Sequence, residues 1–339
     1  MAARRRATTT TTRDDFADAL AEQVAAERTA EADAEIAKTP FVAWVEKRGQ
    51  HLEPGQRALA RVLFDRADPA DLEGEERARA LRMFGCERIP EQARKLGINL
   101  AVCGGRGGKS LMAAWRLVYL AATLPLVLSP GEQAFAIIVA PDLRLAEQTL
   151  RYCIGIAQEW FPEKGRVCEE SSLGFTLVRA QAGAEGDKWA DERVRFAILP
   201  ASKGGSAQRG RALVGAILDE AAFFRGDDSA VNDRDVIDAI TPRIIVGGEI
   251  IISTTPWARN GEVYALFDRN WSHPVDAVVA HAPTWELRTD ERILAQVERE
   301  KQRDPWNYAR EFGAQFIERD QGTFFEADAL SACTSEVAA

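Results

Sequence analysis

The chain has 339 residues, of which 46% are hydrophobic, and it carries a net charge of −9. This length and hydrophobic content suffice for one large α/β domain with appendages. The acidic charge disfavours general, non-specific binding of nucleic acid, although a locally basic channel remains compatible with it.

Cysteine, histidine and apolar patterns narrow the class of protein further. The five cysteines form no CxxC pair and no signal peptide is recognised, which together predict reduced thiols in a cytosolic protein. The three histidines lack metal-ligand spacing. Arg116 and Pro125 interrupt the longest apolar run, so we expect a buried helix there and no membrane partner.

Residues 1–40 are expected to form an N-terminal arm that is partly disordered and partly helical. Three arginines and a threonine run open it, and Phe16, Leu20 and Val24 then follow at a spacing of four. This thin apolar stripe suits either a helix that docks on a partner or a helix that lies on the domain surface. The packed core domain is predicted over residues 41–260.

Gln56 follows Pro54 at the start of a helix predicted over 57–66. The glutamine amide can accept a hydrogen bond from N6 of adenine and donate one to N7. Glutamine is also common in the first helical turn, so Gln56 alone does not indicate an adenine site. It does so only together with the glycine-rich loop about forty residues later. Together the two favour ATP over GTP, and no Asn-Lys-x-Asp guanine motif follows.

A glycine-rich turn connects the apolar run Ile98–Val102 to a helical pattern. This order predicts a phosphate-binding Walker A loop, in which backbone N–H groups and a helix N-terminus bind the anion. Lys109 would reach the β- and γ-phosphates, and Ser110 would bind Mg²⁺. The first glycine of the usual pattern is replaced by Cys103, and a glycine-rich turn without ligand is the alternative. The predicted ATP-binding residues are Gln56, Gly104, Gly105, Arg106, Gly107, Gly108, Lys109 and Ser110.

Strand and helix patterns then alternate, with a strand at 134–140, a helix at 143–160 and strands at 175–179 and 194–199. This alternation predicts parallel crossovers and a doubly wound sheet. The fold class is therefore α/β, a P-loop NTPase of the ASCE (RecA-like) type with a mainly parallel sheet.

Two later strands end in chemistry-bearing residues. The run 213–218 ends in Asp219, which can hold Mg²⁺ through water, and in Glu220, which can orient and deprotonate the attacking water. A strand that merely ends in two surface acids is the alternative. The strand 249–252 ends in Ser253-Thr254-Thr255, whose hydroxyls can change partners when the γ-phosphate leaves; an ordinary Ser/Thr turn is the alternative.

The composition changes after residue 260, and we expect a small helical lid over 261–325 rather than another βαβ unit. Asp290 is predicted to cap a helix that runs to about residue 300. Residues 326–339 are expected to begin a linker.

The ordered motifs resemble those of the ATPase part of the large terminase subunit of tailed bacteriophages, over about residues 52–325. They are Pro54-x-Gln56, Gly104–Ser110, Arg209-Gly210, Ile217–Ala222, Ser253–Pro256, Asn260-Gly261, Arg310-Glu311-Phe312 and Gly322–Phe325. The resemblance implies ATP and Mg²⁺ as cofactors and Glu220 as the catalytic carboxylate. It implies that Gln56 recognises adenine and that Ser253, Thr254 and Thr255 couple hydrolysis to DNA movement.

The resemblance also implies partners and a location. These are double-stranded DNA, the portal protein, the small terminase subunit and a homo-oligomeric ring, in the host cytoplasm and docked at the procapsid portal. Arg209 stands where relatives place a catalytic arginine that acts on the neighbouring subunit's ATP; a salt bridge or a DNA contact is the alternative. Many relatives carry a Walker A arginine at the position of Gly105, whereas here Arg106 follows one residue later.

The sequence thus predicts a motor that translocates double-stranded DNA into a capsid. Lys203, Arg209 and Arg211 form a local basic cluster and are the candidate DNA contacts, which would be made to phosphates. A helicase-like DNA-dependent ATPase and a non-hydrolysing, nucleotide-dependent ring scaffold are the alternatives. Large terminases carry a nuclease domain after the lid, and we expect no nuclease activity from this chain.

Overall fold

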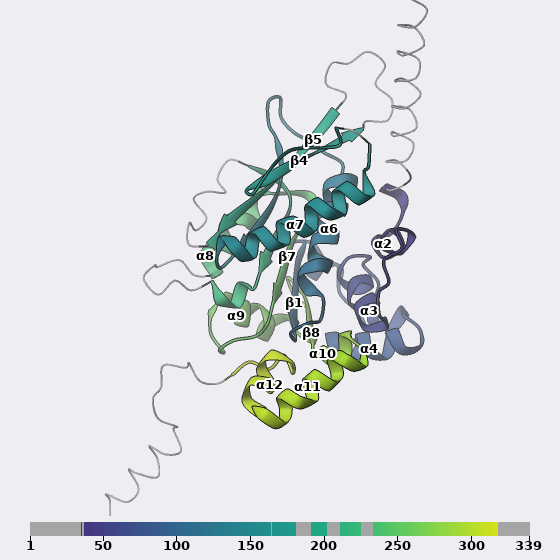
Figure 1. Ribbon diagram of the computed structural model, residues 1–339, viewed down its shortest axis with the longest axis vertical. Helices are drawn as coiled ribbons and strands as arrows, with labels where there is room; N and C mark the ends of the chain where they lie inside the picture. Colours follow the sequence, from purple (N-terminus) through teal and green to yellow (C-terminus); the bar gives the residue numbers. More distant parts are fainter. Residues whose placement is uncertain are drawn as a thin grey trace, which may run out of the picture.

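The computed structural model describes residues 35, 37–163, 165–180, 191–201, 211–224 and 233–317 (Figure 1). Most of the predicted N-terminal arm therefore lies outside the described residues. So do Lys203, Arg209 and the segment 318–339.

Eight strands form one sheet in the order β3-β4-β5-β2-β6-β7-β1-β8. From β5 to β8 all neighbours in this order are parallel, whereas β3 and β4 pair antiparallel to each other and β4 to β5. The strands are β1 (Ile98–Cys103), β2 (Ala134–Ala140), β3 (Val167–Ser171), β4 (Gly174–Ala180), β5 (Asp191–Pro200), β6 (Ala212–Asp219), β7 (Ile244–Thr254) and β8 (Val278–Ala282). The expected α/β fold with a mainly parallel sheet is confirmed.

The strand order places β7 between β1, which leads into the glycine-rich loop, and β6, which ends at Asp219. One strand between these two is the arrangement that defines the ASCE class predicted from the sequence. Every residue of β1 and β6 is buried, because helices cover both faces of the sheet. This is why both strands read as nearly continuous apolar runs.

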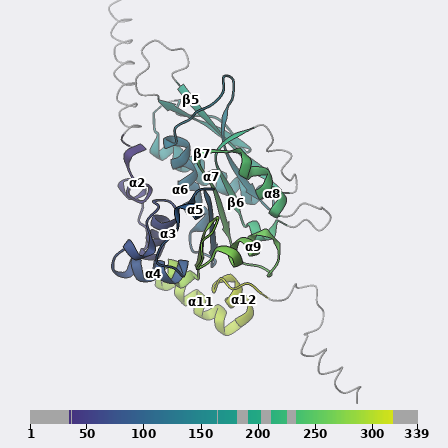
Figure 2. The ribbon, with the colours of Figure 1, turned by 180° about the vertical axis from the view of Figure 1, so that it is seen from behind.

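Helices cover the two faces in separate layers (Figures 1 and 2). The larger layer packs into one hydrophobic cluster with the sheet, and the smaller layer packs into a second cluster on the other face. The larger layer comprises α2 (Phe41–Lys47), α3 (Pro54–Leu63), α4 (Gly74–Phe84), α6 (Lys109–Thr123) and α7 (Leu143–Trp160), and the smaller one α8 (Asp233–Ile240) and α9 (Gly261–Asn270). None of the helices in the described part of the chain has the length and apolarity needed to cross a membrane.

One expectation about the sheet was wrong, and one strand was missed. The core does not end at residue 260, because β8 pairs in parallel with β1 and α9 completes the β7-α9-β8 crossover. The hairpin strand β3 was not predicted, since most of its residues are exposed and it depends on pairing with β4 for its place in the sheet.

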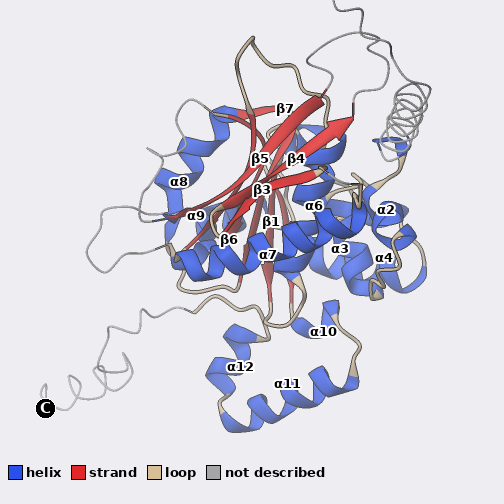
Figure 3. Cartoon of the chain, turned by 45° about the horizontal axis from the view of Figure 1, so that its top comes forward, coloured by secondary structure: helices blue, strands red, loops and turns tan. Residues whose placement is uncertain are grey.

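The helices that follow β8 form the expected lid beyond the carboxyl edge of the sheet (Figure 3). They are α10 (Thr284–Leu287), α11 (Glu291–Arg303) and α12 (Pro305–Glu311). Asp290 caps α11 as predicted, accepting hydrogen bonds from the N–H groups of Arg292 and Ile293. Stacking of Trp285 on Tyr308, with ring centroids 5.7 Å apart, ties α10 to α12.

Shorter elements connect the larger ones. They are α5 (Glu91–Arg94) and the 3₁₀ turns η1 (Pro69–Asp71), η3 (Ala221–Phe223) and η4 (Thr241–Arg243). The turn η3 directly follows Glu220 and carries Phe223 beside the site described below.

Candidate active site

The predicted motifs meet at the carboxyl edge of the sheet. In the parallel register Val102 lies opposite Thr254 and Asp219 lies opposite Ser253, so β1, β7 and β6 end at the same level. The loop 104–110, the acids after β6 and the hydroxyl residues after β7 are therefore neighbours. Ligands of open α/β sheets bind at this edge.

The glycine-rich loop begins one residue later than the usual pattern. Cys103 is the last residue of β1 and is fully buried, and burial raises the pKa of its thiol to about 12. A core position therefore explains the cysteine. Gly108 has a φ of +89°, and a Cβ there would lie 2.7 Å from Nε2 of Gln56, so only glycine fits. Arg106 is exposed at the tip of the loop, with a φ of +60°.

Gln56 is buried against this loop. Its Nε2 donates to the carbonyl of Gly107 at 2.9 Å, and its Oε1 accepts from the N–H of Glu53 at 3.2 Å in a capping box at the start of α3. Gln56 thus links α3 to the phosphate loop. The predicted contact with adenine remains a prediction.

Lys109, Glu220 and Thr255 form a closed triangle. Nζ of Lys109 lies 2.7 Å from Oε1 of Glu220 and donates to Oγ1 of Thr255 at 3.1 Å, and the N–H of Thr255 donates to Oε2 of Glu220 at 2.9 Å. Burial lowers the pKa of Lys109, but the charge of Glu220 and its hydrogen bond raise it, and the net pKa lies above the ordinary value. The lysine therefore stays cationic at neutral pH.

Glu220 is held in a left-handed backbone conformation, with φ +52° and ψ +44°. A glutamate in this region is strained, and such strain persists where the surroundings fix it. Here the N–H of Glu220 donates to the carbonyl of Ser253 at 2.7 Å. The bond turns the carboxylate away from the path of β6 and towards Lys109.

Asp219 is fully buried and accepts hydrogen bonds from three hydroxyls. Oδ1 accepts from Ser110 at 3.0 Å and from Ser253 at 2.7 Å, and Oδ2 accepts from Thr149 at 2.8 Å. Thr149, on α7, was missed by sequence reasoning. It is a buried polar residue between Ala146 and Leu150 on the apolar face of α7, and that pattern is the signal that could have identified it.

The oxygen pair of Ser110 and Asp219 fits a small divalent cation. Mg²⁺ prefers hard oxygen ligands and usually keeps several waters alongside one or two protein groups and substrate phosphates. A hydroxyl and a carboxylate 3.0 Å apart at the start of α6 supply such a partial set. Within the described residues there is no group of three or more His, Cys, Asp or Glu that could hold a metal ion.

The three coupling candidates have different surroundings. Ser253 holds Asp219, and Thr255 contacts Lys109 and Glu220. The Thr254 hydroxyl donates to the carbonyl of Thr255 at 2.8 Å and accepts from the N–H of Ala222 at 3.2 Å, so it shapes the turn rather than facing the site. Of the three, Thr255 is best placed to respond to nucleotide.

The lid contacts the phosphate loop through backbone groups. The N–H of Gly105 donates to the carbonyl of Glu311, at the end of α12. The hydroxyl of Thr284, at the start of α10, donates to the carbonyl of Gly105 at 2.8 Å. Gly105, which stands where many large terminases carry a Walker A arginine, is thus bonded to the lid through both its N–H and its carbonyl.

Arg211 lies at the opposite edge of the sheet, at the start of β6. That eight-residue strand separates it from the nucleotide edge by about 26 Å. Its guanidinium carbon lies 4.7 Å from the centroid of the Phe135 ring. Arg211 is therefore not part of the ATP site, and its predicted DNA contact remains a prediction, as do those of Lys203 and Arg209 outside the described residues.

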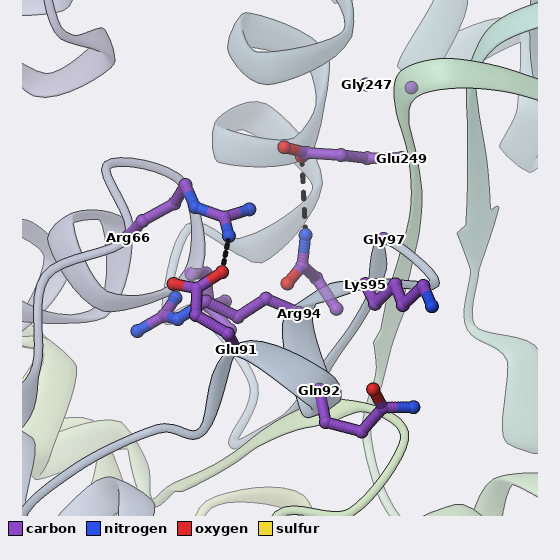
Figure 4. A pocket seen from close by; sticks show the side chains of 11 residues that line it. Arg66, Glu91, Gln92, Arg94, Lys95, Gly97, Gly247 and Glu249 are labelled. Carbon is purple, nitrogen blue, oxygen red and sulfur yellow. Dashed lines mark hydrogen bonds and ion pairs between the residues drawn. The ribbon is translucent and has the colours of Figure 1, made fainter.

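A cavity of about 430 Å³ also lies at this opposite edge, between α5, the start of β1 and the first half of β7 (Figure 4). Several of its charged groups pair within the protein: Arg66 with Glu91, and Arg94 with Asp68 at 3.5 Å. Asn99 donates to Glu249 at 3.3 Å. The cavity lies at the start of β1, whereas the phosphate loop follows the end of that strand, so it is not part of the ATP site.

The chain was compared with protein families, curated proteins and solved structures. Neither a scan against protein-family models nor a search of curated proteins found a match. Among solved structures, the chain is similar to the ATPase domain of the Thermus phage P74-26 large terminase, with 18% identity, a TM-score of 0.49 and coverage of 74% of this chain and 100% of that one.

Two further similar structures are longer large terminases. That of a thermophilic bacteriophage in complex with ADP has 15% identity and a TM-score of 0.45, covering 66% of this chain and 48% of that one. That of bacteriophage HK97 has 16% identity and a TM-score of 0.43, covering 77% and 55%. The matched structures belong to the family that the sequence motifs resemble. With TM-scores below 0.5 and identities of 15–18% these likenesses carry no argument about function, so we base the function on the site.

Proposed function

We propose that the chain hydrolyses ATP at the carboxyl edge of its sheet and uses the energy to package double-stranded viral DNA. The observation that carries the ATPase proposal is the Lys109–Glu220–Thr255 triangle, placed directly beside the Ser110–Asp219 pair. The Lys109 ammonium group, the Glu220 carboxylate, the Thr255 hydroxyl and the two oxygens that would bind a metal lie together at the ends of β1, β6 and β7. Phosphoryl transfer requires such positioned charges more than it requires covalent chemistry.

Each residue has a role that follows from its contacts. Ser110 and Asp219 would hold Mg²⁺, which supplies charge neutralisation on the phosphates when bound. Lys109 exchanges Glu220 for phosphate oxygens, and this exchange frees the carboxylate. Glu220, fixed by the carbonyl of Ser253, then orients the attacking water and accepts its proton.

The contacts between lid and loop support a motor rather than a simple hydrolase. Because Glu311 and Thr284 bond Gly105 directly, a change in the phosphate loop reaches the lid without an intermediary. In the proposed cycle the lid moves DNA held by phosphate contacts, in a ring docked on the portal protein with the small terminase subunit. Arg209 would complete the neighbouring subunit's site.

The Glu220→Gln variant tests the ATPase. It keeps the shape and loses the base, so turnover of ATP should fall by about 10²- to 10⁴-fold while MgATPγS still binds. Glu291→Gln, an exposed position at the start of α11, is the matched control and should hydrolyse normally. Hydrolysis at the parental rate by Glu220→Gln would contradict the assignment.

A second experiment tests the motor. ATP-dependent uptake of double-stranded DNA into procapsids that carry the portal should occur with the parental chain and fail with Glu220→Gln. ATP-driven strand separation without uptake would instead support the helicase-like alternative. Nucleotide-dependent ring assembly without turnover would support the scaffold.

A further inference from the structure

Trp257 lies between the coupling segment and the lid. It follows Thr255 by two residues and is half-buried. On one side its ring meets that of Phe223 in η3, with centroids 5.1 Å apart. On the other side the guanidinium carbon of Arg310, on α12, lies 4.5 Å from its ring centroid.

Arg310 is fixed to the lid and lies beside the phosphate loop. Its Nη2 lies 2.9 Å from Oε1 of Glu311 and donates to Oδ1 of Asn307 at 3.1 Å, both within α12. The next residue, Glu311, accepts the N–H of Gly105 through its carbonyl. The guanidinium is therefore held by its own helix and presents a face to Trp257, so the contact joins two otherwise separate elements.

The chain that follows the lid also contacts the backbone around Trp257. The N–H of Ile317 donates to the carbonyl of Trp257 at 2.9 Å, and Ala258 and Ile317 form a parallel bridge. The chain that leaves α12 thus returns to the segment that leaves β7. A shift of Trp257 changes both the ring contact and this backbone contact.

Thr255 is the point at which such a shift would start. It is bonded to both Lys109 and Glu220, and both of these must change partners when phosphate arrives. Pro256 stands between Thr255 and Trp257, and its ring fixes φ and restricts the preceding residue as well. The connection therefore has less freedom to absorb a movement of Thr255, which favours its transmission to Trp257.

We propose that Trp257 and Arg310 are positioning residues that transmit the state of the nucleotide site from Thr255 to the lid. This proposal rests on the proposed ATPase function and adds a defined route to it. In the described part of the chain neither side chain forms a hydrogen bond or ion pair with Lys109, Asp219 or Glu220, so neither is expected to act in the chemical step. A desolvated contact between a cation and an aromatic ring corresponds to about a 2- to 30-fold shift in a two-state equilibrium.

Amide hydrogen exchange of α12 in the full chain, with and without MgATPγS, provides the test. In the parental chain MgATPγS should change the exchange of Pro305–Glu311. Trp257→Leu and Arg310→Gln should bind MgATPγS and hydrolyse ATP like the parent, yet show a measurably smaller change, because only the contacts of Gly105 with the lid then remain. Trp257→Phe, which keeps an aromatic face, should retain it.

Trp306→Ala is the matched control. Trp306 lies on the same helix, is 77% exposed and should not affect the response. Arg310→Gln keeps the test decisive if Trp257→Leu fails to fold. An undiminished α12 response in Arg310→Gln would overturn the relay and leave the ATPase intact. A parental chain that binds no MgATPγS would overturn both, so the two failures are distinguishable.

Discussion

Helix α6 carries two buried cations, and each pairs with a glutamate of the sheet in a different way. Lys109, at its first turn, meets Glu220 through a single nitrogen, and that carboxylate is 22% exposed. Arg116, two turns later, binds both oxygens of Glu249, with Nε at 2.9 Å from Oε2 and Nη2 on Oε1. The first pair lies at the nucleotide edge and the second towards the opposite edge.

The surroundings of Arg116 make its pair permanent. Its guanidinium carbon lies 5.1–5.5 Å from the centroids of the rings of Phe41, Phe64 and Tyr119. Asn99 adds a hydrogen bond to Glu249. The planar fork of arginine is suited to such bidentate, stacked contacts.

Lys109 has the opposite character. An ammonium group is a point charge on a flexible stem and can exchange one set of oxygens for another. Its partner Glu220 has a strained backbone, so the pair is poised to open when phosphate oxygens arrive. The two ion pairs of this helix thus have different roles. Several contacts at once fix the Arg116–Glu249 pair, whereas the Lys109–Glu220 pair can exchange partners.

The largest expected effect is on the permanent pair. Arg116→Met should lower the free energy of unfolding by up to about 3–5 kcal/mol, because it leaves the partly buried Glu249 carboxylate without its cation. Denaturant unfolding measures this loss. Replacing Glu249 by Leu in the same chain should recover most of it. ATP turnover per folded molecule should stay near the parental value, and its loss in a folded variant would contradict a purely structural role.

The Lys109–Glu220 pair should show the reverse, a large effect on ATP turnover and a small one on stability. Lys109→Ala should reduce ATP turnover by about 10²- to 10³-fold, equivalent to about 2.7–4 kcal/mol, because it removes a cation aimed at the phosphates. Its melting temperature should change little, since Glu220 keeps its hydrogen bond from Thr255. Lys95→Ala, an exposed lysine at the opposite edge, serves as the control. A loss of stability in Lys109→Ala as large as that in Arg116→Met would contradict the difference between the exchangeable and the permanent pair.

A smaller effect is expected at Thr149. Thr149→Val removes the donor to Oδ2 of Asp219 and should raise the Mg²⁺ concentration for half-maximal hydrolysis about tenfold. The buried acceptor left behind should also cost about 1–3 kcal/mol of stability. Thr123→Val, which removes a hydroxyl at the last turn of α6, should leave the Mg²⁺ dependence unchanged. An unchanged Mg²⁺ requirement in Thr149→Val would show that Ser110 and Ser253 hold Asp219 sufficiently by themselves.

The sequence predicted the position of a residue correctly where that residue stands at or shortly after the end of a strand. Lys109, Asp219 and Thr255 were each predicted from a separate motif, and the parallel register brings the ends of their strands to one edge. Thr149 and Arg310 could not be placed in that way. Each reaches its partner from a helix, and the contact depends on how that helix packs.

The sequence by itself determined the α/β alternation, the glycine-rich loop and the acid and hydroxyl residues that end β6 and β7. These follow from local periodicity and from the backbone freedom that a loop such as the one at Gly108 requires. Only the tertiary structure decided that β8 joins the core next to β1, and that Lys109 faces Glu220 while Arg116 binds Glu249. Strand order and side-chain partnership depend on long-range packing, and no local pattern along the chain encodes them.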